Sequence, residues 1–225
     1  MINEIRSSVQ RLHPLIHCIT NPISINQCAN AILAVGARPI MAEHPKEVSE
    51  ITATAHALLL NLGNITDTRM ESMQISAKTA ISKDIPFIVD VVGTACSELR
   101  RNFAFTLIEK TKPTVIKGNY SEILALYNAS YKSSGVDADS SLNKDVICKA
   151  ASQLAVKYNT IILASGKTDI VTDGKHLASI QNGTPQLSTV MGTGCMAGSV
   201  VCLLSVCKSK HIVYHNCLCG IGYLR

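Results

Sequence analysis

The segment of this 225-residue chain best suited to chemistry is Gly192-Thr193-Gly194-Cys195. Glycines leave backbone N–H groups accessible, and the N-terminus of a helix carries partial positive charge. A glycine turn that opens a helix, made here by Gly192, Thr193 and Gly194, can therefore act as an anion hole for a phosphoryl group. Cys195 falls in the first turn of that helix, where a thiol is suited to accept a proton. A buried cysteine that only packs beside a turn fits the same residues.

Two carboxylates follow expected strands. Asp90 ends the strand expected over 86–91, and Glu122 lies in the first turn of the helix expected over 121–128. Carboxylates in these places can hold Mg²⁺ directly or through water, and the metal then bridges the phosphates of ATP. The alternative for Glu122 is helix capping, with Asn119 as the cap and the acid three residues later. The alternative for Asp90 is an ordinary turn at the end of a strand.

Other polar residues have two readings each. Ser165 opens the segment 165–169, whose hydroxyl and amides can hold nucleotide phosphates or form a plain turn. Asn21 either caps the helix-like stretch after it or contacts a ligand. His17 lies in an apolar run and is expected to be a core residue with satisfied hydrogen bonds. Met41 is expected in the core, with a ligand wall as the alternative.

Short apolar runs alternate with longer amphipathic stretches along the chain. Strands are expected over 57–63, 86–91, 114–117 and 160–164, and helices over 68–83, 98–111, 121–128, 144–158 and 197–207. Uniformly apolar strands between helices predict an α/β fold with a mostly parallel sheet and helices on both faces. Asp173-Gly174 between two strand-like runs predicts a hairpin, so the sheet is expected to end in antiparallel strands. Because ligands bind beyond the carboxyl ends of parallel strands, the polar strand ends are expected to converge on one site.

Composition excludes several classes of protein. Hydrophobic residues make up 47% of the chain and charged residues 16%, which provides a core and argues against disorder. Aromatic residues are only 4%, and the Arg100-Arg101 pair is interpreted as a solvated helix end, so no nucleic-acid partner is expected. The longest apolar run, 197–207, is too short to span a bilayer. The nine cysteines are odd in number and no signal peptide precedes them, which favours reduced thiols in a cytoplasm; Cys217 and Cys219 lack the spacing of a zinc site.

Taken together, these segments resemble the hydroxyethylthiazole kinase family of the ribokinase-like superfamily. The resemblance runs from His13 to the last residue. The matching segments, in order, are His17 to Asn21, Pro39 to Ala42, Asn61 to Gly63, Gly118 to Glu122, Gly135 to Ala138 and Gly192 to Cys195. No single motif is decisive, but six in order at plausible spacing identify the family.

The resemblance implies one ribokinase-like kinase domain over 1–225 that transfers the ATP γ-phosphoryl group to the hydroxyethyl alcohol of a thiazole in vitamin B1 synthesis and salvage. It implies Cys195 as the base and Gly192 to Gly194 as the anion hole. Met41, Asn21 and Gly192 would contact the thiazole, and Lys117, Ser165 and Asn119 would line ATP. Asp90 and Glu122 would bind Mg²⁺. The family is typically trimeric, with the substrate pocket at a subunit boundary.

Three features depart from the family pattern. Lys117 stands where the family usually has Arg, which keeps the charge but loses the bidentate fork and predicts weaker ATP binding. Val91 stands where the family has Pro, which predicts a looser turn. The chain is also expected to lack the family's C-terminal helices. Two alternatives therefore remain: a sister kinase for hydroxymethylpyrimidine or a vitamin B6 alcohol, and a non-catalytic descendant that binds thiazole or nucleotide.

Overall fold

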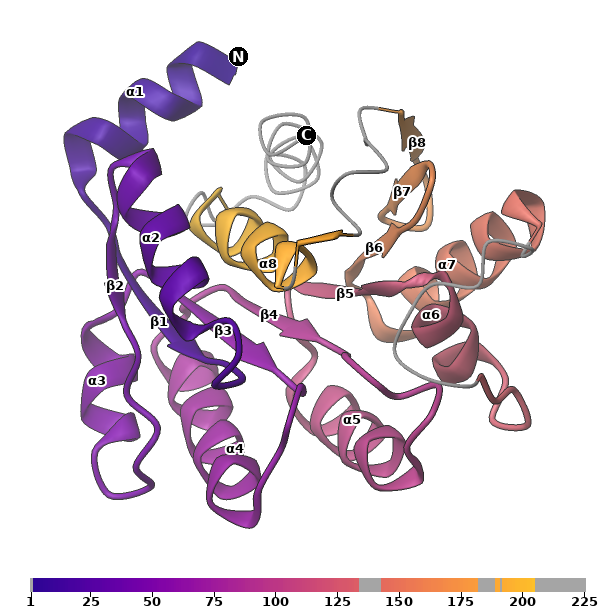
Figure 1. The fold of residues 1–225 in the computed structure, drawn as a ribbon, viewed down its shortest axis with the longest axis horizontal. Coiled ribbons are helices and arrows are strands. Elements are labelled where there is room, and N and C mark those ends of the chain that lie inside the picture. The colour runs from indigo at the N-terminus through magenta and orange to yellow at the C-terminus, as the bar shows by residue number, and fades with distance from the viewer. Residues whose placement is uncertain (1, 134–142, 182–188, 191, 205–225) are drawn as a thin grey trace.

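The computed structural model describes residues 2–133, 143–181, 189–190 and 192–204. Eight strands form one sheet in the order β2-β1-β3-β4-β5-β6-β7-β8 (Figure 1). The strands are β1 (Leu15–Ile19), β2 (Arg38–Ile40), β3 (Ala57–Asn61), β4 (Phe87–Asp90), β5 (Val115–Asn119), β6 (Ile161–Ser165), β7 (Asp169–Thr172) and β8 (Leu177–Ile180). Neighbours from β2 to β6 are parallel, and β7 and β8 each pair antiparallel with the strand before them. The predicted mostly parallel sheet with an antiparallel edge is confirmed.

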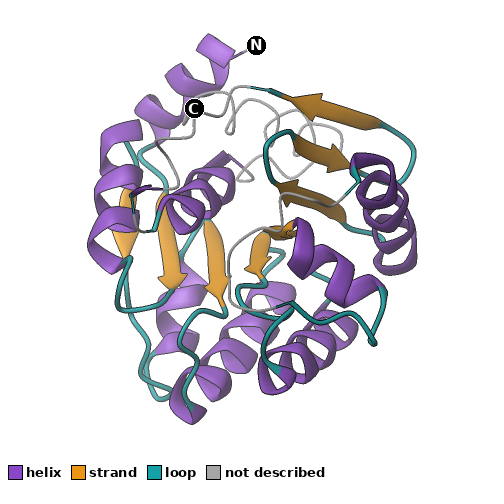
Figure 2. Ribbon diagram, turned by 45° about the vertical axis from the view of Figure 1, so that its right-hand side comes forward, coloured by secondary structure: helices purple, strands orange, loops and turns teal. Residues whose placement is uncertain are grey.

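Helices cover both faces of this sheet (Figures 1 and 2). The helices are α1 (Ile2–Leu12), α2 (Ile25–Val35), α3 (Val48–Thr54), α4 (Asp67–Ser82), α5 (Glu98–Thr111), α6 (Tyr120–Tyr127), α7 (Lys144–Tyr158) and α8 (Thr193–Leu204). Side chains of α1, α2 and α8 form one apolar core with the sheet, and side chains of α3 to α7 form the second core on the opposite face. Strands buried on both faces have no polar side to present, which is why their sequences read as continuous apolar runs.

The hairpin at the sheet edge is also confirmed. The Asp173 carboxylate accepts the backbone N–H groups of Lys175 and His176 at 2.9 and 2.7 Å. Gly174 between them has φ +90°, a conformation that favours glycine. The turn therefore returns β8 beside β7, with Asp169 paired to Ile180 and Thr172 to Leu177.

Four elements were not predicted. β1 was interpreted only as an apolar run, and β2 has three residues, one of them Pro39. Helix α3 has seven residues, and α1 opens the chain with a mixed, polar sequence. Short or edge elements give weak periodic signals because their stability comes from neighbours rather than from their own pattern.

Other sequence predictions concern segments that the structure does not describe. They are the Gly135 to Ala138 match, residues 205–207 of the last expected helix, and the Cys217 and Cys219 pair. The expectation about the family's C-terminal helices also concerns residues after 204. Within the described segments, no helix is long and apolar enough to cross a membrane. The six cysteines that are described are free thiols: Cys18, Cys28, Cys96, Cys148, Cys195 and Cys202.

Candidate active site

The carboxyl ends of four parallel strands place polar side chains side by side. Asn21 follows β1, Asn61 ends β3, Asp90 ends β4, and Lys117 lies in β5 opposite Asp90 in the register. The order β2-β1-β3 means that the chain leaves β1 toward one side of the sheet and later continues on the other. Such a switch point opens a crevice where ligands bind in sheets of this kind. The two strands that flank it are β1, which Asn21 follows, and β3, which ends at Asn61.

Helix α8 lies over these strand ends and brings Cys195 to them. The helix begins at Thr193, so Cys195 is in its first turn as predicted. Gly198 allows the close approach, because a Cβ there would lie 3.2 Å from Asp90 Oδ2. At Gly194 a Cβ would lie 3.8 Å from Lys117 Nζ, an ordinary contact distance. Gly192 has φ +84°, which a glycine adopts without strain at the turn into the helix.

Two side-chain amides donate to the sulfur of Cys195. Asn21 Nδ2 and Asn61 Nδ2 each lie 3.3 Å from Sγ. Asn21 is 7% exposed and Asn61 is fully buried, whereas Cys195 is half-buried. The half-buried sulfur is therefore held from the protein side by two buried amide groups.

Asp90 and Lys117 form a buried ion pair beneath the start of α8. Lys117 Nζ lies 3.0 Å from Oδ1 and 2.9 Å from Oδ2, and Asn61 Nδ2 also donates to Oδ2 at 3.0 Å. Burial raises the pKa of Asp90, although the charge and hydrogen bonds of Lys117 oppose that shift. Burial by itself lowers the pKa of Lys117, but attraction to Asp90, Cys195 and Glu122, together with the hydrogen bonds to Asp90, outweighs burial and the pKa is raised. Lys117 thus stays a cation at the base of the site.

Glu122 is held by the backbone. Its two carboxylate oxygens accept the N–H groups of Gly93 and Asn119, both at 2.7 Å, while Asn119 Oδ1 accepts the N–H of Glu122 at 2.9 Å. The capping box weighed from the sequence is therefore present. Burial and the negative charge of Asp90 raise the pKa of Glu122 to about 7, although the two backbone bonds oppose the shift. The carboxylates of Asp90 and Glu122 therefore repel each other electrostatically.

The expected ATP residues lie on neighbouring strands. Ser165 ends β6 opposite Asn119 in the register, and Ser165 Oγ donates to Gly118 O at 3.4 Å. A Cβ on Gly118 would meet Val91 Cγ2 at 2.8 Å and Glu122 Cβ at 3.1 Å, so this strand end requires glycine. Val91 donates its N–H to Lys117 O at 2.8 Å, a bond that proline could not make. This bond anchors the start of the turn, and the looser turn expected from Val91 stays a prediction.

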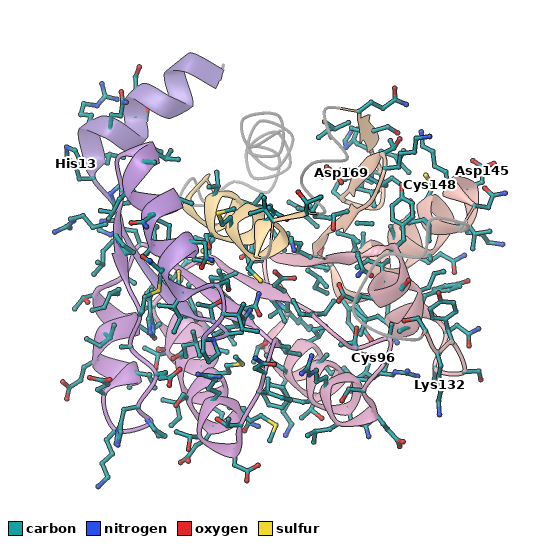
Figure 3. All side chains as sticks on the ribbon, viewed as in Figure 1. His13, Cys96, Lys132, Asp145, Cys148 and Asp169 are labelled. Atoms are coloured by element: carbon teal, nitrogen blue, oxygen red, sulfur yellow. The ribbon has the colours of Figure 1, made fainter. Side chains whose placement is uncertain are left out.

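Met41 and His17 lie toward the other edge of the sheet. Met41 is half-buried after β2 and packs against the core beneath α2 and α8. His17 is fully buried, as expected, with Nε2 2.9 Å from Ala42 O and Nδ1 2.9 Å from Thr52 Oγ1. Because a carbonyl only accepts, Nε2 carries the hydrogen. Figure 3 shows that the two edges of the sheet lie on opposite sides of the molecule, since His13, ahead of β1, and Asp169, in β7, are well separated there.

One sequence interpretation was wrong and one residue was overlooked. Arg101 is not a solvated helix end. It is 6% exposed and donates to the backbone oxygens of Thr94, Ala95 and Ala129, which ties the loop after β4 to the end of α6. Asn61 was noted only as part of a strand-end motif. Its position directly at the carboxyl end of a buried strand was the signal that could have marked it as a site residue.

Comparisons with known proteins identify the family of this chain. The chain matches the Hydroxyethylthiazole kinase family over residues 6–220. It is 48% identical over 203 residues to hydroxyethylthiazole kinase 2 of Clostridium botulinum (strain 657 / Type Ba4), covering 88% of this chain and 77% of that protein. The chain belongs to the hydroxyethylthiazole kinase family. A family member from Finegoldia magna is 42% identical over 209 residues, covering 92% of this chain and 77% of that protein.

Solved structures support the fold of this hydroxyethylthiazole kinase family member. The hydroxyethylthiazole kinase protein of Pyrococcus horikoshii OT3 is similar with a TM-score of 0.86 and 28% identity, over 96% of this chain and 81% of that chain. An ADP complex of Bacillus subtilis pyridoxal kinase is similar in fold alone, with a TM-score of 0.67 and 16% identity over 92% of this chain and 89% of that chain. The predicted ribokinase-like fold is therefore confirmed, and the chain is a kinase by family.

Proposed function

We propose that this protein transfers the γ-phosphoryl group of ATP to the hydroxyethyl alcohol of 4-methyl-5-(2-hydroxyethyl)thiazole, a step in thiamine synthesis and salvage. The observation that carries the proposal is the position of Cys195. Cys195 lies in the first turn of α8, and the same helix lies against the Asp90–Lys117 pair. The chain also belongs to a family of kinases. A proton acceptor, a helix N-terminus and a buried cation thus meet at the carboxyl ends of the parallel strands.

The residues of the chain divide the work. Cys195 accepts the proton of the alcohol while the alcohol oxygen bonds to phosphorus and the bond from phosphorus to the ADP oxygen breaks. The turn from Gly192 to Gly194 receives the migrating phosphoryl group, because the first N–H groups of a helix have no partner within it. Met41 and Gly192 line the thiazole, with Asn21 beside them. Positioning and charge stabilisation account for most catalysis in reactions of this kind.

Asp90 and Glu122 suit a magnesium ion that arrives with ATP. Their donors are carboxylate oxygens, which Mg²⁺ prefers. Burial and the negative charge of Asp90 raise the pKa of Glu122, and a cation would relieve the repulsion between the two carboxylates. Within the described segments no group of three or more His, Cys, Asp or Glu side chains could hold a metal ion. ATP phosphates and water would therefore complete its ligands. An Mg²⁺ ion held by these residues would neutralise charge on the phosphates.

The nucleotide would lie over the ends of β5 and β6. Lys117, Asn119 and Ser165 are the side chains proposed for it, and they come from these two paired strands. Lys117 already gives two hydrogen bonds to Asp90, which supports the expectation that ATP is held less tightly than by the arginine common in the family. Calorimetric titration of Lys117→Arg with ATP and Mg²⁺ tests this, with tighter binding expected for the variant.

We also propose that the chain acts in the cytoplasm as a homotrimer with the thiazole pocket at a subunit boundary. An exposed apolar side chain near the site supports a boundary there: Ile23, two residues after Asn21, is 52% exposed. Light scattering on the purified chain gives the mass of the assembly. A monomer at micromolar concentration contradicts this part of the proposal.

The function is tested by incubating the protein with ATP, Mg²⁺ and hydroxyethylthiazole and detecting the phosphorylated thiazole by mass spectrometry. Hydroxymethylpyrimidine and pyridoxine in parallel reactions separate this activity from that of a sister kinase. Binding of thiazole in calorimetry without any product at high protein concentration would instead identify a non-catalytic descendant.

Cys195→Ala tests the base. We expect kcat to fall by about 10²-fold or more, the usual scale for a general base, with the Kd for ATP within about twofold of the wild-type value. Cys195→Asp restores a proton acceptor at the same place and is the matched control. An unchanged kcat in Cys195→Ala removes the sulfur from the mechanism.

A further inference from the structure

The hydrogen bonds around Cys195 leave the two asparagine side chains no freedom to rotate. Asn21 Oδ1 accepts the N–H of Ser24 at 3.1 Å, and Asn61 Oδ1 accepts the N–H of Gly63 at 2.9 Å. A flipped amide would turn its NH₂ group against a backbone N–H in either place, and two donors would face each other. Each backbone N–H therefore fixes the orientation of one side-chain amide.

The fixed oxygens determine where the NH₂ groups point. Asn21 Nδ2 donates to Cys195 Sγ and to Asn61 Oδ1, both at 3.3 Å. Asn61 Nδ2 donates to Sγ at 3.3 Å and to Asp90 Oδ2 at 3.0 Å. Both hydrogens of each amide are thus used, and each oxygen accepts at least one bond. A buried network with every donor used is rigid.

We propose that Asn21 and Asn61 are positioning residues that hold the sulfur of Cys195, and that Asn61 links the sulfur to the Asp90–Lys117 pair. This rests on the proposed kinase function and assigns Asn21 to the sulfur rather than to the thiazole. The side chain of Asn21 is 7% exposed with both N–H groups engaged, which leaves it little to offer a ligand. Cys195, in contrast, is only half-buried, so its side chain is partly accessible to an alcohol.

Two double-mutant cycles test the assignment. Asn21→Ala is expected to lower kcat about 10-fold in the wild-type background, since a misplaced catalytic atom can cost up to about 10²-fold. In a Cys195→Ala background the same change is expected to alter kcat by less than about twofold, because no sulfur remains to be positioned. The KM for the thiazole alcohol stays within about twofold in both backgrounds. If Asn21 contacts the thiazole instead, KM rises in both backgrounds and the proposal fails.

The Asn61 cycle is expected to differ in one respect. Asn61→Ala is expected to lower kcat about 10²-fold, and to keep part of this effect in the Cys195→Ala background, because it also removes a bond to Asp90. Should Asn61→Ala not fold, Asn61→Asp keeps the acceptor for Gly63 and loses both donors, and the same cycle applies. Equal fold-changes in the two backgrounds would mean that Asn61 does not act through the sulfur.

A readout without catalysis separates this inference from the proposed function. The rate at which iodoacetamide alkylates Cys195 is measured by peptide mass spectrometry at one pH. Asn21→Ala and Asn61→Asp are expected to change that rate at least threefold, while the control Asn102→Ala on the far side of the sheet leaves it unchanged. Unchanged rates in both site variants overturn the proposal. A changed rate in a protein without kinase activity supports the positioning and refutes only the function.

Discussion

The parallel part of the sheet, from β2 to β6, and its antiparallel edge, β7 and β8, place similar residue types in opposite surroundings. In the parallel part, Asp90 pairs with Lys117 at side-chain exposures of 0% and 4%, and His17 is fully buried. At the antiparallel edge, Asp173 pairs with His176 at side-chain exposures of 22% and 62%. Helix α8 covers the first region, and β8 leaves the second open to solvent. Burial therefore makes the first pair part of a site and leaves the second as the closure of a turn.

The strongest way to break this comparison is to remove the buried acid. Asp90→Ala leaves the ammonium of Lys117 buried without its partner, and we expect the free energy of unfolding to fall by about 3–5 kcal/mol. Urea denaturation at pH 7 measures it. The double variant Asp90→Ala/Lys117→Met removes both charges and is expected to regain most of the loss. A single-variant loss below about 1 kcal/mol would show that the pair is not desolvated.

The buried His17 predicts that the free energy of unfolding depends on pH. Burial lowers the pKa of His17, whereas the unfolded chain binds the proton near the ordinary value of 6.5. Below that pH the unfolded state holds more protons, so stability is lost as pH falls, by at most about 1.4 kcal/mol per pH unit from this group. His17→Gln is expected to flatten the pH dependence of the unfolding free energy between pH 7 and 5. Thr52→Val, which keeps the buried histidine, should retain the slope.

Substitutions at two glycines of α8 measure how tightly this helix packs against the parallel strands. Gly198→Ala would press a methyl group against Asp90 Oδ2 at 3.2 Å, an atom that Lys117 and Asn61 hold in place. Overpacking outweighs the better helix propensity of alanine, so a net loss of about 1 kcal/mol is expected in thermal or urea denaturation. Gly194→Ala has 3.8 Å to its nearest atom and is expected to retain or gain stability. Equal effects at the two positions would contradict the close approach at Gly198.

The smallest effect belongs to the antiparallel edge. Burial by itself raises the pKa of Asp173, but hydrogen bonds from His176 and the turn amides together outweigh burial and lower the pKa to about 2. Its contribution is therefore present above the ordinary value of 3.8 and is lost as pH falls toward 2. Solvent weakens such a pair, so Asp173→Ala is expected to cost only about 0.2–1 kcal/mol at pH 7 in urea denaturation. A loss of unfolding free energy close to that of Asp90→Ala would contradict the distinction between the buried and the exposed ion pair.

The sequence determined the fold class of this protein and showed that polar residues lie at the ends of its strands. Uniformly apolar strands between amphipathic helices fixed a parallel sheet, because a strand buried on both faces has no polar side. The Asp-Gly pair fixed the antiparallel edge for a reason as local, since Gly174 supplies a positive φ. Ordered motifs from Asn21 to Cys195 were sufficient to predict the family, which the comparisons then confirmed.

Tertiary structure decided the partners of those residues. Nothing local in the sequence joins Asn21 or Asn61 to a sulfur at position 195, since each bond depends on how α8 packs over the sheet. Nor does local sequence separate Arg101, which is buried and bonded to three carbonyl oxygens, from an ordinary charged helix end. Periodicity records which face of an element is buried. The hydrogen-bond partners of a buried polar group come from distant segments, and only the folded chain brings those together.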